Sequence, residues 1–293
     1  MNIDKYEVFV RVADIGSITG AAKQMGYTQS GVSHVVNALE DEFGFQLLIR
    51  KKAGVTLTPE GERMARCMRE VIGHNEQLMQ EASSIHGLRT GQVRIGTFSS
   101  VAVHWLPKII TGFKQRFPLI GLSLMDGVYQ DIEDWIAQEQ IDCGFITKST
   151  HKELDYVPLA QDRMLAILPQ GHPLANSAFL PFAAIADEQL IIPGEGSNYD
   201  IGRILRQAGV SPSIRFAISD DYAAIAMVEQ GLGISILPEL VLEGQVYRVR
   251  AIELEGGCCR TIGIAVRSEK NASPACREFI AYVKAWVRDN VSI

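Results

Sequence analysis

Two groups of polar side chains near the amino terminus are suited to contact with double-stranded DNA. Residues 28–34 offer hydroxyl, amide and imidazole groups that exchange hydrogen bonds with base edges and phosphates. Residues 50–52 concentrate three positive charges in one turn, which suits the phosphate backbone. The alternative for residues 28–33 is that they only cap a helix and face solvent. The predicted DNA-contacting residues are Ser17, Thr28, Gln29, Ser30, Ser33, His34, Arg50, Lys51 and Lys52.

Patterns that would indicate a catalytic centre do not occur in the sequence. It holds no GxSxG nucleophile turn, no GxxxxGK[ST] phosphate loop and no HExxH zinc pattern. The histidines are scattered, and none has a partner at metal-ligand spacing. We therefore expect no enzyme activity, no metal and no cofactor.

The five cysteines form neither a CxxC motif nor a His/Cys metal pattern. They are Cys67, Cys143, Cys258, Cys259 and Cys276. We interpret them as reduced residues that mostly serve packing. A redox role for the adjacent pair Cys258 and Cys259 is the alternative.

The composition is that of a folded protein outside the membrane. Hydrophobic residues make up 47% and charged residues 21% of the 293 residues, inside the globular range. Apolar stretches are too short for a spanning helix, and the amino terminus lacks the apolar core of an export signal, so we expect a cytoplasmic protein. The formal net charge of -6 opposes long-range attraction to DNA, so any DNA affinity must be local.

The amino-terminal segment has the features of a helix-turn-helix. Ser17 is predicted to cap a helix over residues 18–25, Gly26 to make the turn, and Thr28 to cap a helix that ends near residue 43. Small residues are needed where the two helices cross, and Ala21 and Ala22 supply them. The residues predicted to face inward on the second helix are Val32, Val35 and Leu39.

A hairpin and a long helix follow the helix-turn-helix. Two short apolar runs flank the basic turn, which is typical of a β-hairpin. Thr58 and Pro59 then indicate a strong helix start. The helix carries a seam with heptad spacing, which indicates a partner helix, whereas packing on its own domain is the alternative. The seam residues are Met64, Met68, Val71, Asn75, Leu78, Ala82 and Ile85.

From residue 93 onward, short apolar strands alternate with helices, which indicates an α/β domain. The predicted strands lie near residues 93–97, 122–125, 143–146, 164–168, 190–192, 214–218, 234–237 and 261–266. Helices are expected between most of them.

The chain resembles the LysR-type transcriptional regulator family, and the resemblance covers essentially its whole length. In the first part it is carried by Phe9, Gly16-Ser17, Ala21-Ala22, Gln29-Ser30, Ser33, Leu39-Glu40, Gly44, Leu47, Arg50, Leu57-Thr58 and Gly61. It continues through residues 91–96, 106–107, 117–118, 141–142, 171–174 and 228–238. The sequence departs from the family at His34, where Arg is more frequent, and at Leu48, where Phe is usual.

The resemblance implies three parts. The first is a winged helix-turn-helix at 1–58, and the second is a linker and dimerisation helix at 59–89. The third is an effector domain at 90–293, a two-lobed α/β fold like a type 2 periplasmic binding protein. Lobe I would span about 90–161 and 267–293, and lobe II about 162–266, with crossovers near Gln161 and Val266.

The resemblance further implies a small-molecule effector between the lobes. In open α/β sheets, ligands bind beyond the carboxyl ends of strands and against helix N-termini, and Ser99 and Ser100 occupy such a place. Their hydroxyls, with the amides of Ser100 and Val101, would suit a carboxylate or another anion, with simple helix capping as the alternative. Glu195 would either meet a cationic group of the ligand or repel anions, so it leaves the ligand class open. The predicted effector-binding residues are Ser99, Ser100, Gly127, Val128, Thr147, Glu195, Gly196 and Asp221.

The expected partners are double-stranded promoter or operator DNA, a small-molecule effector and further copies of the chain. The expected assembly is a dimer through the linker helix, with tetramers as the family often forms, and RNA polymerase is an additional candidate partner. A solute-binding protein would share the second domain, but it would need an export signal and no DNA-reading head. The hypothesis is a switch in which the effector stabilises one lobe closure and shifts the paired DNA-binding domains.

Overall fold

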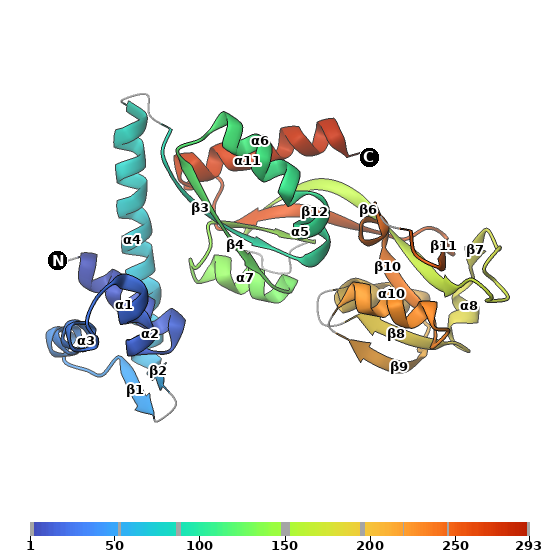
Figure 1. Ribbon diagram of the computed structural model, residues 1–293, viewed down its shortest axis with the longest axis horizontal. Coiled ribbons are helices and arrows are strands. Elements are labelled where there is room, and N and C mark those ends of the chain that lie inside the picture. Colours follow the sequence, from blue (N-terminus) through green and yellow to red (C-terminus); the bar gives the residue numbers. More distant parts are fainter. Residues whose placement is uncertain are drawn as a thin grey trace. The chain divides into compact units, whose positions relative to one another are not determined.

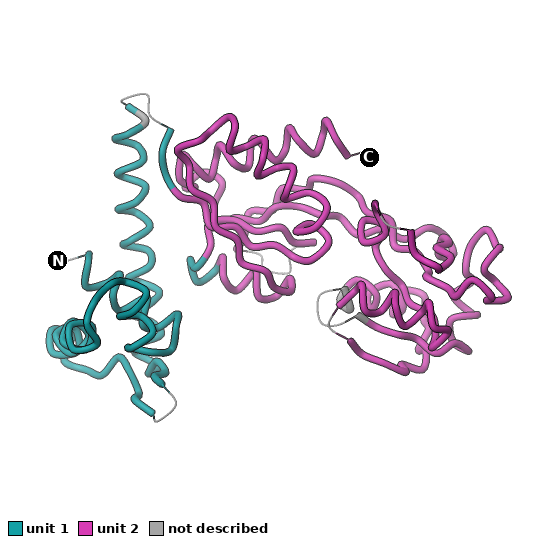
Figure 2. The backbone as a smooth tube through the Cα atoms, viewed as in Figure 1, with its two compact units in different colours: residues 1–91, 137–140 teal, residues 92–136, 141–293 magenta. Residues whose placement is uncertain are grey.

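The computed structural model describes residues 3–51, 54–85, 89–147, 153–193, 197–218, 220–244 and 246–291. The chain divides into two compact units (Figure 2). One comprises residues 1–91 with 137–140, and the other residues 92–136 with 141–293. Each unit has its own hydrophobic core.

The first unit consists of three helices, a hairpin and a long helix. These are α1 (Ile3–Ile15), α2 (Ile18–Met25), α3 (Gln29–Phe43), β1 (Leu48–Lys51), β2 (Gly54–Leu57) and α4 (Pro59–Ile85). The predicted caps are confirmed, because the side chain of Ser17 accepts from the Gly20 amide and that of Thr28 from the Gly31 amide. Gly26, in the left-handed region at φ 71°, ends α2 and makes the predicted turn.

The core of this unit lies where α1, α2, α3 and the start of α4 meet. Phe9 is fully buried, and Ala21 and Ala22 are buried where the helices approach, as predicted. On α3 the most deeply buried residues are Val32, Val36 and Leu39. Val35 is partly buried against the same core, so its predicted inward position is confirmed, whereas the fully buried Val36 was not predicted.

The hairpin is an antiparallel pair with Leu48 opposite Leu57 and Lys51 opposite Gly54. The carboxylate of Glu40 on α3 accepts hydrogen bonds from the amides of Leu47 (2.7 Å) and Leu48 (3.1 Å). These bonds hold the start of β1 against α3. The predicted winged helix-turn-helix is thus confirmed.

The second unit contains two lobes. Lobe I is formed by β3 (Gly91–Thr97), α5 (Ser99–His104), α6 (Leu106–Arg116), β4 (Ile120–Asp126), α7 (Tyr129–Ala137), β5 (Cys143–Ile146) and α11 (Pro274–Asn290). Its sheet has the order β4-β3-β5, with β3 and β5 parallel. The helices cover a large apolar core in which Phe113, Phe145 and Phe279 are fully buried.

Lobe II holds two smaller apolar clusters. Its elements are β7 (Phe179–Leu180), α8 (Phe182–Ile185), β8 (Gln189–Pro193), α9 (Ser197–Ala208), β9 (Ser213–Ile218), α10 (Asp221–Glu229), β10 (Ser235–Pro238), the 3₁₀ helix η1 (Glu239–Leu242) and β11 (Val249–Leu254). Strands β8 and β9 form a parallel pair. Strands β10 and β11 pair with the long strand described next.

Two long strands connect the lobes, β6 (Asp155–Pro169) and β12 (Cys259–Val266). They run antiparallel and side by side from one lobe to the other (Figure 1). Because Gly263–Val266 already pairs with β5 of lobe I, β12 passes between the lobes before the expected crossover near Val266. The mixed α/β fold class is confirmed.

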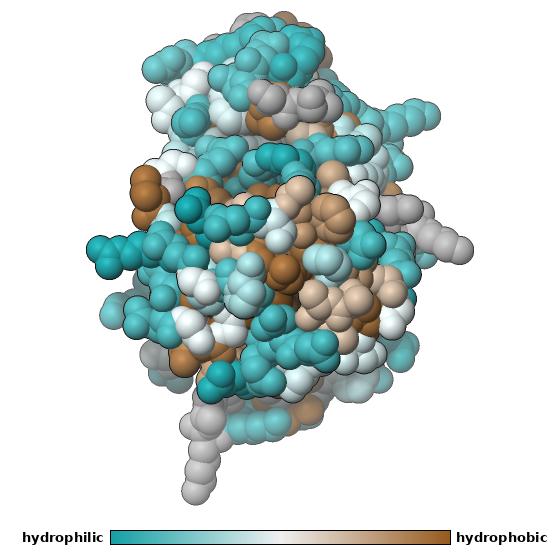
Figure 3. Space-filling model, turned by 90° about the vertical axis from the view of Figure 1, so that its right-hand side faces the viewer, coloured by the Kyte–Doolittle hydropathy of each residue, from teal (hydrophilic) through white to brown (hydrophobic). Residues whose placement is uncertain are grey.

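No helix in the described ranges is long and apolar enough to cross a membrane. Most of the face drawn in Figure 3 is hydrophilic, and apolar side chains gather in its middle.

Candidate nucleic-acid interface and interlobe polar cluster

Helix α3 presents most of the predicted DNA-contacting residues on its exposed side. Gln29, Ser30 and His34 are exposed, and Ser33 is half-buried. The hydroxyl of Thr28 caps the helix and lies 3.2 Å from the Ser30 hydroxyl. The amino-terminal half of α3 is therefore an open polar surface. Ser17, in contrast, is half-buried and serves as the cap of α2.

The hairpin brings a cation beside this surface. Arg50 and Lys51 are exposed on β1, whereas Lys52 lies outside the described residues. The guanidinium of Arg50 donates a 2.6 Å hydrogen bond to the side-chain oxygen of Asn37 on α3. Sequence reasoning missed Asn37, although it lies eight residues after Gln29 and four after Ser33, on the same face of the helix.

Several acids of this unit are engaged within the unit itself. Glu40 is held by the hairpin amides. Asp14 pairs with Arg69 at 2.6 Å. These acids are therefore already paired, while Arg50 of the hairpin is exposed beside the polar face of α3. A local positive charge is thus available for DNA although the net charge of the whole chain is negative.

In the second unit, a polar cluster lies where the two connecting strands meet lobe I. Its centre is Arg260 on β12, which is 2% exposed. The guanidinium donates to Asp162 on β6 (2.9 Å from Nε), to the Tyr129 hydroxyl (2.8 Å) and to the Ser100 hydroxyl (2.8 Å). It also stands over the ring of Phe98, 5.2 Å from the ring centre. Arg260 therefore connects β6, α5 and α7.

Asp200 on α9 brings lobe II to this cluster. It is 3% exposed, and it pairs with Arg203 at 3.6 Å from Nη2 to Oδ1. Burial raises the pKa of the Asp200 carboxyl, while Arg260, Arg203 and Tyr129 act in the opposite direction. The effect of burial is the larger one.

The predicted effector-binding residues fall in different environments. Ser99 is exposed, whereas Ser100 is buried and bound to Arg260. The amide of Gly127 donates to the Thr97 carbonyl, and that of Val128 to Asp131. Both of these amides are thus used within the protein.

The remaining predicted effector residues are also spread out. Thr147 is buried directly after β5, and Asp221 begins α10. Glu195 and Gly196 lie outside the described residues. Sequence reasoning missed Arg260 and Asp200. A charged residue inside the apolar strand run at 259–266 was the signal that could have identified the first.

A second contact between the lobes joins α5 and α10. The Tyr222 hydroxyl lies 3.3 Å from Nε2 of His104. Burial lowers the pKa of His104, with Glu243 acting against it. The neutral imidazole is therefore favoured in the folded protein.

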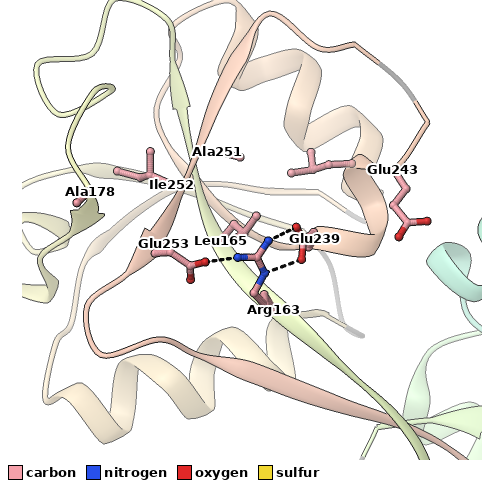
Figure 4. A pocket seen from close by; sticks show the side chains of 9 residues that line it. Arg163, Leu165, Ala178, Glu239, Glu243, Ala251, Ile252 and Glu253 are labelled. Atoms are coloured by element: carbon pink, nitrogen blue, oxygen red, sulfur yellow. Dashed lines mark hydrogen bonds and ion pairs between the residues drawn. The ribbon is translucent and has the colours of Figure 1, made fainter. Parts of the chain in front are cut away.

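A pocket of about 490 Å³ opens on lobe II. Its lining includes Arg163, which is paired with both Glu239 and Glu253 (Figure 4). Because these two acids and Glu243 outnumber the single arginine, the lining carries net negative charge and disfavours an anionic ligand.

A winged helix-turn-helix joined to a two-lobed α/β unit defines a class of DNA-binding regulators with a ligand-binding domain. Residues 3–62 match the family described as "Bacterial regulatory helix-turn-helix protein, lysR family", and residues 86–288 match "LysR substrate binding domain". The chain belongs to the LysR family of transcriptional regulators.

Relatives of full length support this assignment. The HTH-type transcriptional regulator YvbU of Bacillus subtilis (strain 168) is 33% identical over 287 residues, which cover 97% of this chain and 98% of the relative. The regulator MetR of Escherichia coli (strain K12) is 28% identical, with coverage of 94% and 87%. The protein is accordingly a DNA-binding transcription regulator with an effector-binding domain.

Solved structures share the fold. A full-length OxyR variant from Pseudomonas aeruginosa aligns with a TM-score of 0.79 at 21% identity and covers 98% of this chain and 95% of that one. The LysR family regulator CbnR, in complex with its target DNA, aligns with a TM-score of 0.66 at 20% identity, with coverage of 97% and 99%.

Proposed function

We propose that α3 enters the major groove of operator DNA and that the hairpin holds the adjacent phosphates. Gln29, Ser30, Ser33 and His34 would contact base edges or the backbone, because they lie on the open face of α3. Arg50 and Lys51 would neutralise phosphates. The observation that carries this proposal is the Arg50–Asn37 hydrogen bond, since it sets a cation beside the polar face of α3.

The operator-binding form is a dimer through α4. The first part of the predicted seam packs into its own unit, where Met68 is 2% exposed. The later part is open, with Leu78 65% exposed and Ile85 84% exposed. A helix that leaves such residues on a heptad seam is stabilised by a second copy. In this proposal the parts of the chain are 1–58, 59–89 and 90–293, and dimers assemble further into tetramers.

The effector binds between the lobes of the second unit, close to Ser100 and Thr147, and shifts the equilibrium between lobe arrangements. Because the DNA-binding units are paired, such a shift changes their placement on DNA. The protein acts in the cytoplasm, where its DNA is, and contact with RNA polymerase follows if it activates transcription.

A footprint on the DNA beside its own gene tests the central part of this proposal. Wild type is expected to protect a discrete site, and Ser33→Ala and Arg50→Ala are expected to weaken that protection. An effector is expected to alter the length or bending of the protected site. A discrete footprint that neither variant weakens would reject the assignment of α3 and the hairpin.

A further inference from the structure

In the interlobe cluster, the hydrogen-bonding groups around Arg260 are satisfied, but one oxygen of Asp200 is not. Asp162 receives the Nε and Nη2 groups of Arg260 through Oδ2, and its Oδ1 accepts from the Leu240 amide. The guanidinium and the Asp162 carboxylate are therefore satisfied by the protein itself. They form a buried ion pair that needs no ligand.

Asp200 is the acid that remains. Its side chain is 4% exposed, and within the described ranges its Oδ2 has no hydrogen-bond partner. Buried polar atoms in folded proteins are nearly always paired, so a buried oxygen without a partner calls for an explanation such as an unseen ligand. Burial raises the pKa of this carboxyl despite the nearby Arg203 and Arg260, as expected where one carboxylate oxygen is buried without a donor.

The position of Asp200 connects it to both lobes. Arg203, one turn along α9, donates to the Cys259 carbonyl at the start of β12. Asp200 also interacts with Tyr129 and Arg260 of the cluster. The free oxygen therefore lies at the place where lobe II meets the connecting strand and lobe I.

We infer that Asp200 receives an amino group of the effector, so that the ligand class is a small amine or amino acid. An ionised carboxylate only accepts hydrogen bonds, so its partner must be a donor, and an ammonium also neutralises the charge. This inference rests on the proposed function, since it places the ligand between the lobes. It narrows the expected carboxylate effector to one that also carries an amine, because a plain carboxylate would be repelled by Asp200.

Thermal-shift measurements on the full chain test the inference. The probes are the twenty L-amino acids, putrescine and agmatine, and each amino acid is matched with the α-hydroxy acid that lacks its amino group. At least one amine is expected to raise the Tm of the wild type, and its deaminated counterpart is not. Titration calorimetry with that amine is expected to show at least tenfold weaker binding to Asp200→Asn. Asp187→Asn, which changes an exposed acid of lobe II, is the matched control and should bind as the wild type does.

The stability of the variant without ligand provides a second readout. Asp200→Asn is expected to keep or raise the Tm, because it neutralises a buried carboxyl whose Oδ2 has no hydrogen-bond partner. A lower Tm together with unchanged amine binding would assign Asp200 a structural role and overturn the inference. Two further results would also overturn it, namely a panel in which no amine binds and one in which the hydroxy acids bind as well as the amines.

DNA binding separates this inference from the proposed function. The same wild-type protein is assayed by gel shift on its upstream DNA in parallel. Retained DNA binding without any response to amines rejects the amine assignment alone. If the wild-type protein shows no specific DNA binding, the proposed function is rejected, whether or not amines raise the Tm.

Discussion

The guanidinium of Arg50 donates a hydrogen bond to Oδ1 of Asn37 at 2.6 Å, so that the hairpin and α3 are joined on their exposed side. Three residues further along α3, Glu40 holds the other end of β1 through two amides. These contacts fix the hairpin relative to the helix that is proposed to read DNA. Since Arg50 is exposed, its guanidinium can exchange Asn37 for a phosphate.

Arg50→Ala is expected to weaken DNA binding and to reduce the slope of log Kd against log salt by about one, because each phosphate contact releases roughly 0.9 counterions. Fluorescence anisotropy at several salt concentrations measures both quantities. Lys108→Ala removes an exposed cation of the second unit and should change neither. Equal losses in the two variants would contradict a specific role for Arg50.

Glu40→Ala is expected to destabilise the first unit by about 1–3 kcal/mol, because it leaves the amides of Leu47 and Leu48 without their charged acceptor. Hydrogen exchange over the hairpin, measured by mass spectrometry, should accelerate accordingly. Glu42→Ala is the control, because the pair of Glu42 with Lys5 is exposed and spans 3.6 Å, so its loss should cost ~0–1 kcal/mol. Unchanged exchange in Glu40→Ala would show that the hairpin is held by other contacts.

Arg260→Met is expected to destabilise the second unit by about 3–5 kcal/mol, because Asp162 would then be a buried charge without its cation. The control is Arg163→Met, at the residue that follows Asp162 on β6. It removes an arginine that is 54% exposed, so the unfolding free energy should fall by about 1 kcal/mol or less. Thermal unfolding of the full chain compares the two variants. If they cost the same, the buried pair is not what stabilises the junction of the strands.

Leu78→Asp is expected to shift the protein from dimer to monomer, because Leu78 is 65% exposed on the open part of the α4 seam. Sedimentation at micromolar concentration measures the shift. Val246→Asp, at an exposed apolar residue of lobe II, should leave the dimer intact. A Leu78→Asp protein that sediments as a dimer would rule out α4 as the main dimer contact.

His104 is expected to make folding stability depend on pH in the acidic range. Its pKa is lower in the folded protein than the ordinary value of 6.5, chiefly through burial, so protonation favours the unfolded state. Its contribution is complete above that ordinary value and is lost as the pH falls below it. Unfolding free energies at about pH 7 and about pH 5 should therefore differ more in the wild type than in His104→Asn. Equal differences would mean that other groups account for the pH dependence.

The amino-terminal unit could be predicted closely because its signals are local. Caps at Ser17 and Thr28 and the turn at Gly26 each depend on a few neighbouring residues, and the structure confirms them. The buried Val36 was missed because helical periodicity alone does not rank adjacent apolar residues such as Val35 and Val36 by depth.

The connecting strands were harder to predict. The first half of β6, from Asp155 to Gln161, shows neither a regular alternation of exposed and buried residues nor a continuous buried run, and Pro158 interrupts it. The interlobe cluster depends on Arg260 and Asp162, which are 98 residues apart and meet only through strand pairing. No local pattern indicates such a pair.

Selection from random duplex DNA by the full-length protein, followed by anisotropy titrations of the best sequence, tests most directly whether α3 reads DNA. The account predicts an enriched motif with two related half-sites, affinity that falls steeply with salt, and a loss of about 1–3 kcal/mol of discrimination at one base pair in Gln29→Ala. The absence of any enriched motif, or full discrimination in Gln29→Ala, Ser33→Ala and His34→Ala alike, would contradict it.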